Sequence, residues 1–178
     1  MSTLVKNIVR FCLFILVQVY VLNQIPPLNH LVVPYLYFLF ILWLPYQIGR
    51  RSLLVLGFLL GFCLDAFSNT YGLHAAACVL IAYIRPFLIN VLLTKEEKEL
   101  NYNEPSAQSM GLVPYITYLT ILTFIHHITV FFLSALQTGG WMYFAVKALF
   151  ATAVSLVLIL LTELLFSRKQ RFRTNTAQ

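Results

Sequence analysis

Charged residues are scarce in this chain of 178 residues, and their scarcity excludes most soluble folds. Only 10% of the residues are Asp, Glu, Lys or Arg, whereas about a quarter are charged in a typical soluble domain. Hydrophobic residues make up 60% of the chain and form long runs that short polar breaks separate. A soluble core of this size has no room for so many apolar runs. The composition therefore predicts a single integral membrane domain over residues 1–178.

Cysteine is also scarce, and the chain lacks the common sequence signatures of enzymes. Cys12, Cys63 and Cys78 lie in apolar runs without a CxxC spacing, so neither a disulfide framework nor a zinc site is predicted. No HExxH, P-loop or GxSxG sequence is present. No serine, cysteine or carboxylate stands at a recognisable spacing from a catalytic base. We therefore predict that the protein is not an enzyme and has no catalytic residues, cofactor or metal.

The apolar runs predict an all-α bundle of six transmembrane helices. Their approximate bounds are 8–22, 31–46, 52–67, 73–93, 112–136 and 141–166. No cleavage site with small residues follows the first run, so we expect it to be a retained span.

The positions of the basic residues predict the orientation of this bundle. The net charge of +6 is compatible with binding to nucleic acid. Lysine and arginine instead gather before the first run, in alternate connections and after the last run, at Lys6, Arg10, Arg50, Arg51, Lys95, Lys98, Arg168, Lys169, Arg171 and Arg173. This positive-inside pattern predicts that both termini lie in the cytoplasm. We expect the basic surface to meet anionic membrane lipid and no nucleic acid.

Residues 95–111 form the one sizeable hydrophilic stretch between two runs. Its charged first half has Glu and Lys pairs that can extend the fourth span as a solvated helical turn. We predict a cytoplasmic loop here, and a docking site for a cytoplasmic partner is the alternative.

Four residues between positions 57 and 86 are predicted to act in packing. Gly57 and Gly61 form a GxxxG pair, which lets a second helix approach closely. Gly72 follows a polar turn and can adopt a positive φ angle. Pro86 removes a backbone hydrogen bond from the fourth span and favours a kink there.

Asp65, His74, Arg85 and Lys147 are candidates for a buried polar network, because polar groups within membrane spans are energetically costly. At the helical rise of about 1.5 Å per residue, Asp65 and Lys147 both lie about 10 Å from the outer face. The side chains of Asp65 and Arg85 lean toward each other, because each points toward the N-terminus of its own helix. The alternative for Arg85 and Lys147 is snorkelling to the nearer headgroup layer. We predict that Asp65 pairs with Lys147, His74 or Arg85, and Lys147 is best placed by depth.

His126 and His127 are adjacent near the middle of the fifth run. Neighbouring residues of a helix point about 100° apart, so both rings cannot bind one metal without distortion. We predict neutral histidines that are hydrogen-bonded across helices, and a proton path is the alternative.

The stretch Gly57-x-x-x-Gly61-x-x-x-Asp65, with the following turn, Gly72-Leu73-His74 and Ala82-Tyr83, resembles the signature of the rod shape-determining protein MreD family. Six spans, basic cytoplasmic termini and a second span that contains proline also fit this family. The specific part of the resemblance covers residues 57–83, and the rest of the chain matches in topology.

The resemblance implies a non-enzymatic scaffold of the bacterial cytoplasmic (inner) membrane that takes part in cell elongation. It implies direct binding to MreC, and contact with MreB, the RodA glycosyltransferase and a class B penicillin-binding transpeptidase, either directly or through MreC. Such a scaffold couples MreB filaments to peptidoglycan synthesis and rod shape. The resemblance gives structural rather than chemical roles to the positions that match the family: Gly57, Gly61, Asp65, Gly72 and His74.

The architecture of such proteins is also similar to that of the substrate-binding subunits of energy-coupling-factor vitamin transporters, which is the alternative function. Those subunits dock their partner through small residues spaced four apart on the first span. The first span of this chain contains no alanine or glycine. Asp65, His74 and Lys147 could nevertheless supply polar groups for a small solute near the outer face.

Overall fold

The computed structural model describes residues 3–25, 34–70, 72–93, 102–138, 141 and 144–165. This described part is all-helical and contains no β-strand. Five of its helices are long and apolar enough to cross a membrane, which fits a multi-pass membrane protein. They are α1 (Thr3–Tyr20), α3 (Arg50–Ser68), α4 (Leu73–Leu92), α7 (Leu112–Thr138) and α8 (Phe144–Leu165). The short helices are η1 (Leu22–Gln24), α2 (Leu39–Leu42) and α6 (Ala107–Met110).

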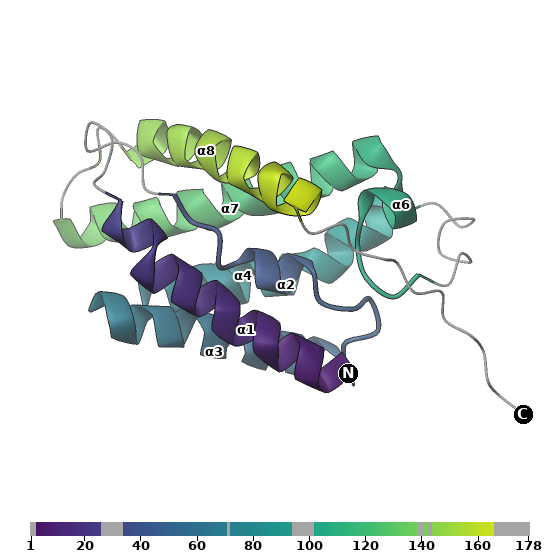
Figure 1. The fold of residues 1–178 in the computed structure, drawn as a ribbon. Helices are drawn as coiled ribbons and strands as arrows, with labels where there is room; N and C mark the ends of the chain where they lie inside the picture. Colours follow the sequence, from purple (N-terminus) through teal and green to yellow (C-terminus); the bar gives the residue numbers. More distant parts are fainter. Residues whose placement is uncertain are drawn as a thin grey trace, which may run out of the picture.

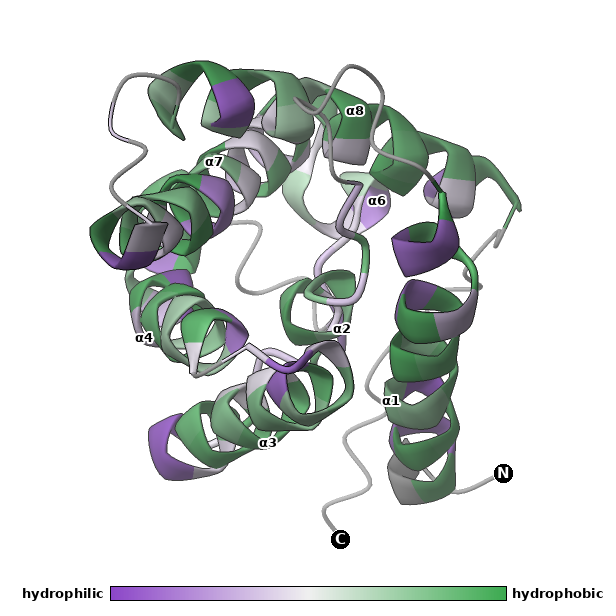
Figure 2. Ribbon diagram, turned by 90° about the vertical axis from the view of Figure 1, so that its left-hand side faces the viewer, coloured by the Kyte–Doolittle hydropathy of each residue, from purple (hydrophilic) through white to green (hydrophobic). Residues whose placement is uncertain are grey.

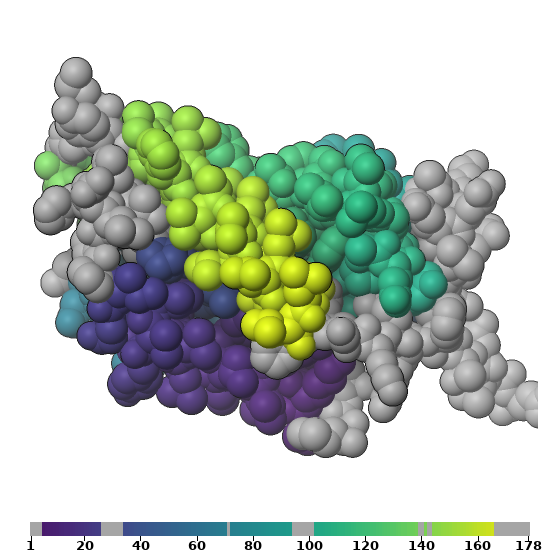
Figure 3. Space-filling model, turned by 45° about the horizontal axis from the view of Figure 1, so that its top comes forward, coloured from purple at the N-terminus to yellow at the C-terminus, as the bar shows by residue number. Residues whose placement is uncertain are grey.

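The five long helices surround a central segment, residues 34–46, which includes α2. Viewed along the bundle, α8, α7, α4, α3 and α1 follow one another around this segment (Figure 2). The pairs α3 and α4, α4 and α7, and α7 and α8 pack directly against each other, and α1 packs on α3. Seen from outside, α1 and α8 lie over the central segment (Figure 3). Large apolar side chains are exposed on every long helix, as lipid contact requires.

The central segment differs from the sequence prediction. A helical span was expected over 31–46, but within its described part only Leu39–Leu42 is α-helical; residues 31–33 lie outside the described residues. The side chains from Tyr37 to Leu44 are at most 4% exposed. A continuous apolar run is typical of a transmembrane helix and equally of a segment buried on all sides by protein. The predicted helical span is therefore wrong for the described part of this run, which protein buries and which contains one short helix.

Gln18 of α1 provides hydrogen bonds that a helix would otherwise supply to the central segment. Its Oε1 accepts a hydrogen bond from the Leu36 backbone N–H at 2.9 Å. Its Nε2 donates to the Pro34 carbonyl oxygen at 3.0 Å. Gln18 is itself fully buried, so its amide group serves the backbone of the segment rather than solvent.

Two further side chains hold the central segment from α7 and α8. The Tyr118 hydroxyl of α7 donates to the Leu42 carbonyl oxygen at 2.9 Å. The Ser155 hydroxyl of α8 accepts from the Tyr35 backbone N–H at 3.2 Å. Irregular backbone at membrane depth is tolerated where protein buries it and satisfies its polar groups. The surrounding side chains therefore allow this segment to be largely non-helical.

Residues 102–111 cover one end of the bundle, which we call the Glu104 end; the opposite end, at the turn between α3 and α4, is called the Asn69 end (Figure 1). The Tyr46 backbone N–H donates to the Asn103 carbonyl oxygen at 2.9 Å. The Tyr46 hydroxyl lies 2.9 Å from the Ser109 Oγ. The described part of the expected loop 95–111 is thus folded against the bundle, and residues 95–101 lie outside the described residues.

The N-terminus of α1 and the C-terminus of α8 both lie toward the Glu104 end (Figure 1). Helices occupy five of the six runs that the sequence predicted to be helical, with bounds that differ by a few residues. The cytoplasmic location of both termini stays a prediction from the charge pattern.

Candidate functional site

Gly57 and Gly61 bring α3 and α4 into close contact. A Cβ atom at Gly61 would lie 2.6 Å from the Ala75 backbone nitrogen, where no real Cβ fits. A Cβ at Gly57 would lie 3.1 Å from the Ala82 Cβ, which is tight. The helix that the GxxxG pair was predicted to admit is therefore α4, the next helix in the chain.

Asp65 caps the N-terminus of α4 from the last turn of α3. Its Oδ1 accepts hydrogen bonds from the Thr70 hydroxyl at 2.6 Å and the His74 backbone N–H at 3.1 Å. Its Oδ2 accepts from the Ala75 backbone N–H at 2.9 Å. The first N–H groups of a helix have no partner within the helix and carry a partial positive charge, so a carboxylate stabilises them. The buried carboxylate thus has a structural role at the hairpin between α3 and α4.

The turn between these helices requires two residues with positive φ. Asn69 ends α3 with a φ of 53°, and asparagine tolerates this left-handed conformation better than most residues. Gly72 precedes α4 with a φ of 80°. The prediction that Gly72 adopts a positive φ is confirmed.

Lys147 does not pair with Asp65. It is half-buried on α8, and no ion pair or hydrogen bond joins these two residues in the part of the chain that the structure describes. The ring places α3 and α8 on opposite sides of the central segment (Figure 2). Counting residues along each span gave the depth of the two groups but not their positions around the ring.

Arg85 neither snorkels nor reaches Asp65. It is 1% exposed, and its Nε donates to the Tyr118 hydroxyl at 3.0 Å. A terminal guanidinium nitrogen donates to the Leu44 carbonyl oxygen. The arginine therefore links α4 and α7 to the central segment. The adjacent Pro86 lies inside α4, which continues to Leu92.

A cluster of histidine and tyrosine side chains, which we call the His–Tyr cluster, lies inside the ring. It consists of Tyr35, Tyr37, His74, His126 and His127. The Tyr37 hydroxyl lies 2.9 Å from His74 Nδ1 and 2.8 Å from His126 Nε2. A single phenol from the central segment therefore connects α4 to α7.

His127 completes the cluster on its α8 side. Its Nδ1 lies 2.8 Å from the Thr123 carbonyl oxygen, and its Nε2 lies 3.1 Å from the Ser155 hydroxyl oxygen. Ser155 also accepts the Tyr35 backbone N–H. The predicted bond across helices is confirmed for His127, which bonds to Ser155 of α8. His126 bonds instead to Tyr37 of the central segment, outside any helix, and the neutral state of both rings stays a prediction.

The hydrogen bonds assign the ring protons if the histidines are neutral. A carbonyl oxygen only accepts, so His127 carries its proton on Nδ1 and accepts from Ser155 at Nε2. When the Tyr37 hydroxyl donates to one of the two rings, it accepts from the other. His74 and His126 therefore share one tautomer: both carry the proton on Nδ1, or both carry it on Nε2.

Sequence reasoning did not assign Tyr35, Tyr37, Thr123 or Ser155 to a site. Their only local signal is the presence of hydroxyl groups within apolar runs. Tyr35 and Ser155 are 120 positions apart, so no spacing in the sequence reveals their contact.

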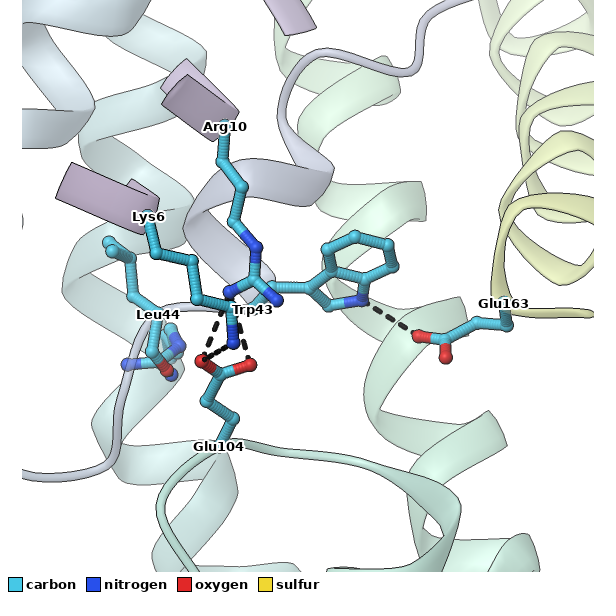
Figure 4. Close-up of polar contacts among 7 residues, drawn as sticks. Lys6, Arg10, Trp43, Leu44, Glu104 and Glu163 are labelled. Carbon is cyan, nitrogen blue, oxygen red and sulfur yellow. Dashed lines mark hydrogen bonds and ion pairs between the residues drawn. The ribbon is translucent and has the colours of Figure 1, made fainter. Parts of the chain in front are cut away.

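Glu104 joins α1 to the segment that covers the Glu104 end. It accepts hydrogen bonds from Lys6 Nζ at 3.1 Å and from Arg10 at 3.0 Å and 3.1 Å (Figure 4). The Arg10 and Glu104 side chains are 16% and 11% exposed, whereas Lys6 is 48% exposed. The paired oxygens of Glu104 therefore bind Arg10 in a largely desolvated geometry, which strengthens this pair.

Trp43 connects this ion pair to α8. The Arg10 guanidinium lies over its ring at 5.5 Å from the centroid. Its indole N–H donates to Glu163 Oε1 at 2.7 Å (Figure 4), and the Tyr115 hydroxyl of α7 donates to the same oxygen. Charged and aromatic groups thus join three long helices, α1, α7 and α8, and the segment 102–111 to the central segment at this end.

We expect Glu104→Gln to lower the free energy of unfolding by about 1–2 kcal/mol, because it removes the charge from a largely buried ion pair in which one Arg10 nitrogen donates to both oxygens. Reversible unfolding in mixed detergent micelles measures this loss. Lys6→Gln is the matched control, and its effect should stay below about 1 kcal/mol because the amine is half exposed. Equal effects of the two substitutions would contradict the claim that Glu104 stabilises the fold mainly through Arg10.

The described residues contain no group of three or more His, Cys, Asp or Glu side chains that could hold a metal ion. In comparisons with known proteins, no family model, curated protein or solved structure matches this chain.

Proposed function

We propose that this chain is a non-enzymatic scaffold of the bacterial cytoplasmic membrane, of the MreD kind, which binds MreC and helps to couple MreB filaments to peptidoglycan synthesis. The proposal rests on one observation: the residues that resemble the MreD signature build the hairpin between α3 and α4. Gly57 and Gly61 admit α4 against α3, Asp65 caps α4, and Gly72 forms the turn. A motif that builds a helical hairpin fits a protein whose task is to hold a shape.

The distribution of polar groups also supports a scaffold. Buried polar side chains such as Gln18 and Arg85 are bonded to backbone carbonyl groups of the central segment. The outside of the ring presents apolar side chains on all five long helices. Interior groups thus fix the bundle, and the apolar exterior is available to lipid and to the transmembrane helix of a partner such as MreC.

The test is affinity purification of the tagged chain from the native membrane, followed by mass spectrometry. We expect MreC to co-purify, and RodA, the class B transpeptidase and MreB to be enriched with it. Purification with ATP-hydrolysing subunits and without MreC would overturn the proposal.

Photo-crosslinking residues on the lipid-facing side of each helix then locate the contact with MreC. Suitable exposed positions are Leu16, Phe62, Phe87, Phe132 and Leu160. We expect crosslinks to MreC from neighbouring helices on one side of the ring. Leu60, which is fully buried, is the control position and should give none.

The His–Tyr cluster favours a second candidate, the substrate-binding subunit of an energy-coupling-factor transporter, because buried polar rings can line a site for a small solute. Against this candidate, the Asp65 oxygens bind the first turn of α4 and Lys147 lies on the other side of the ring. Mass spectrometry of small molecules released from the purified protein tests it. A bound vitamin at one equivalent per chain would favour the transporter.

A further inference from the structure

Two buried polar atoms of α7 have no hydrogen-bond partner among the described residues: Thr123 Oγ1 and His126 Nδ1. Both side chains are 0% exposed. More than about 90% of buried polar groups in proteins have a partner, and each buried group left without one costs about 1–3 kcal/mol. Two such atoms in one place therefore require an explanation.

The two atoms belong to neighbouring positions on one face of α7. Residues three apart on a helix have Cβ atoms about 5–6 Å apart. Helical side chains lean toward the N-terminus of their helix, so the His126 ring leans over the turn that holds Thr123. Since Nε2 is engaged by the Tyr37 hydroxyl, Nδ1 is the ring nitrogen that remains without a partner in the described part of the chain.

The His126 ring is held in this orientation by two contacts. Its Nε2 is 2.8 Å from the Tyr37 hydroxyl. The Phe38 ring stacks on it, with centroids 4.3 Å apart and an interplanar angle of 23°. A rotation that gave Nδ1 another partner would break the bond to Tyr37 and the stacking on Phe38.

We propose that one water molecule occupies a site between Thr123 Oγ1 and His126 Nδ1. Water carries donors and acceptors, and two hydrogen bonds of about 2.8–3.0 Å fit a bridge between positions three apart on a helix. Buried water of this kind satisfies polar groups that the protein leaves unpaired. Phe38, which is fully buried and stacks on the His126 ring, offers no charge to balance an ion, so a neutral molecule such as water is favoured.

The water extends the hydrogen-bonded chain of the His–Tyr cluster. The order becomes His74, Tyr37, His126, water and Thr123, which joins α4, the central segment and α7. Water donates to a bare Nδ1 and accepts from a protonated one. It therefore supports either of the two tautomers that His74 and His126 share.

The test is solid-state NMR of the full chain, with 15N-labelled histidine, in lipid bilayers. Water-edited spectra detect transfer of magnetisation from water to the His126 ring nitrogens, which His126→Gln assigns. We expect clear transfer in the wild type, and at least a threefold loss of it in Thr123→Val. Thr129→Val is the matched control on the same helix, because the Thr129 hydroxyl donates to the Ile125 carbonyl oxygen at 2.7 Å; its His126 transfer should equal that of the wild type.

The same variants give an independent stability measurement. If Thr123 binds water, Thr123→Val removes a satisfied hydroxyl and the folding equilibrium constant falls about fivefold. If the site is dry, valine replaces an unsatisfied hydroxyl with an apolar group of the same shape, and the constant stays equal or rises. A wild-type spectrum without transfer from water to His126, or a stability of Thr123→Val at or above that of the wild type, would overturn the proposal.

Discussion

Asp65→Ala is expected to lower the free energy of unfolding by about 3 kcal/mol, because the change removes three hydrogen bonds to a buried carboxylate and leaves the first N–H groups of α4 without a partner. Asp65→Asn keeps one acceptor oxygen and loses the charge, so about half of this loss is expected. Unfolding in mixed detergent micelles measures both values. Hydrogen exchange at the backbone N–H groups of His74 and Ala75 should accelerate in parallel.

A double-mutant cycle between Asp65 and Lys147 tests whether Asp65 also forms an ion pair with Lys147, as their equal depth in the membrane suggested. Because the two residues lie on opposite sides of the ring, the coupling energy between Asp65→Asn and Lys147→Met should stay below about 0.5 kcal/mol. A larger coupling would mean that the lysine contributes to the site. Wild-type stability of Asp65→Ala would mean that the carboxylate does not cap α4.

Gly61→Ala is expected to lower the free energy of unfolding by about 3 kcal/mol, because the added Cβ meets the backbone of α4 and the two helices must separate. Backbone atoms cannot move aside as a flexible side chain does. Gly57→Ala should lose about 1 kcal/mol, since its added Cβ meets the Ala82 Cβ and the Cys78 carbonyl oxygen at 3.1 Å, and a shift of a few tenths of an ångström relieves both contacts. Thermal unfolding followed by size-exclusion chromatography in detergent ranks the variants.

Gly49→Ala is the control for these two substitutions. A Cβ at this position meets nothing within 4 Å, and its φ of −61° suits any residue. Its loss of stability should stay below about 1 kcal/mol, because Gly49 is the N-cap of α3, where alanine is only moderately less favourable than glycine. If Gly61→Ala proves as stable as Gly49→Ala, close packing of α3 on α4 is wrong.

The hairpin of α3 and α4 is the part of the site that the sequence predicts best. Its determinants are local: Gly57 and Gly61 are one helical turn apart, Asp65 follows at the same spacing, and Gly72 marks the turn. Residues in such a hairpin meet because they are close in the chain. The packing role of the glycines and the positive φ of Gly72 could therefore be predicted. Of the three partners predicted for Asp65, only His74 binds it, and it does so through its backbone N–H rather than its ring.

The central segment and the His–Tyr cluster were beyond sequence reasoning for the opposite reason. Hydropathy measures how apolar a run is, and residues 34–46 are as apolar as a membrane helix. Their actual path depends on Gln18, Tyr118 and Ser155, whose side chains take over the backbone hydrogen bonds. The position of each helix around the ring decides these contacts, and no periodicity in one sequence specifies that position.

The bonds of the central segment also constrain how the protein is made. The Leu42 carbonyl oxygen is bonded by the hydroxyl of Tyr118, which lies 76 positions later in the chain. The Tyr35 backbone N–H is bonded to the hydroxyl of Ser155, which lies 120 positions later. A ribosome delivers residues 34–46 to the membrane long before it has synthesised Tyr118 or Ser155. The segment therefore reaches its final path only after the C-terminal helices have been inserted, and the interior of the ring is a late product of biogenesis.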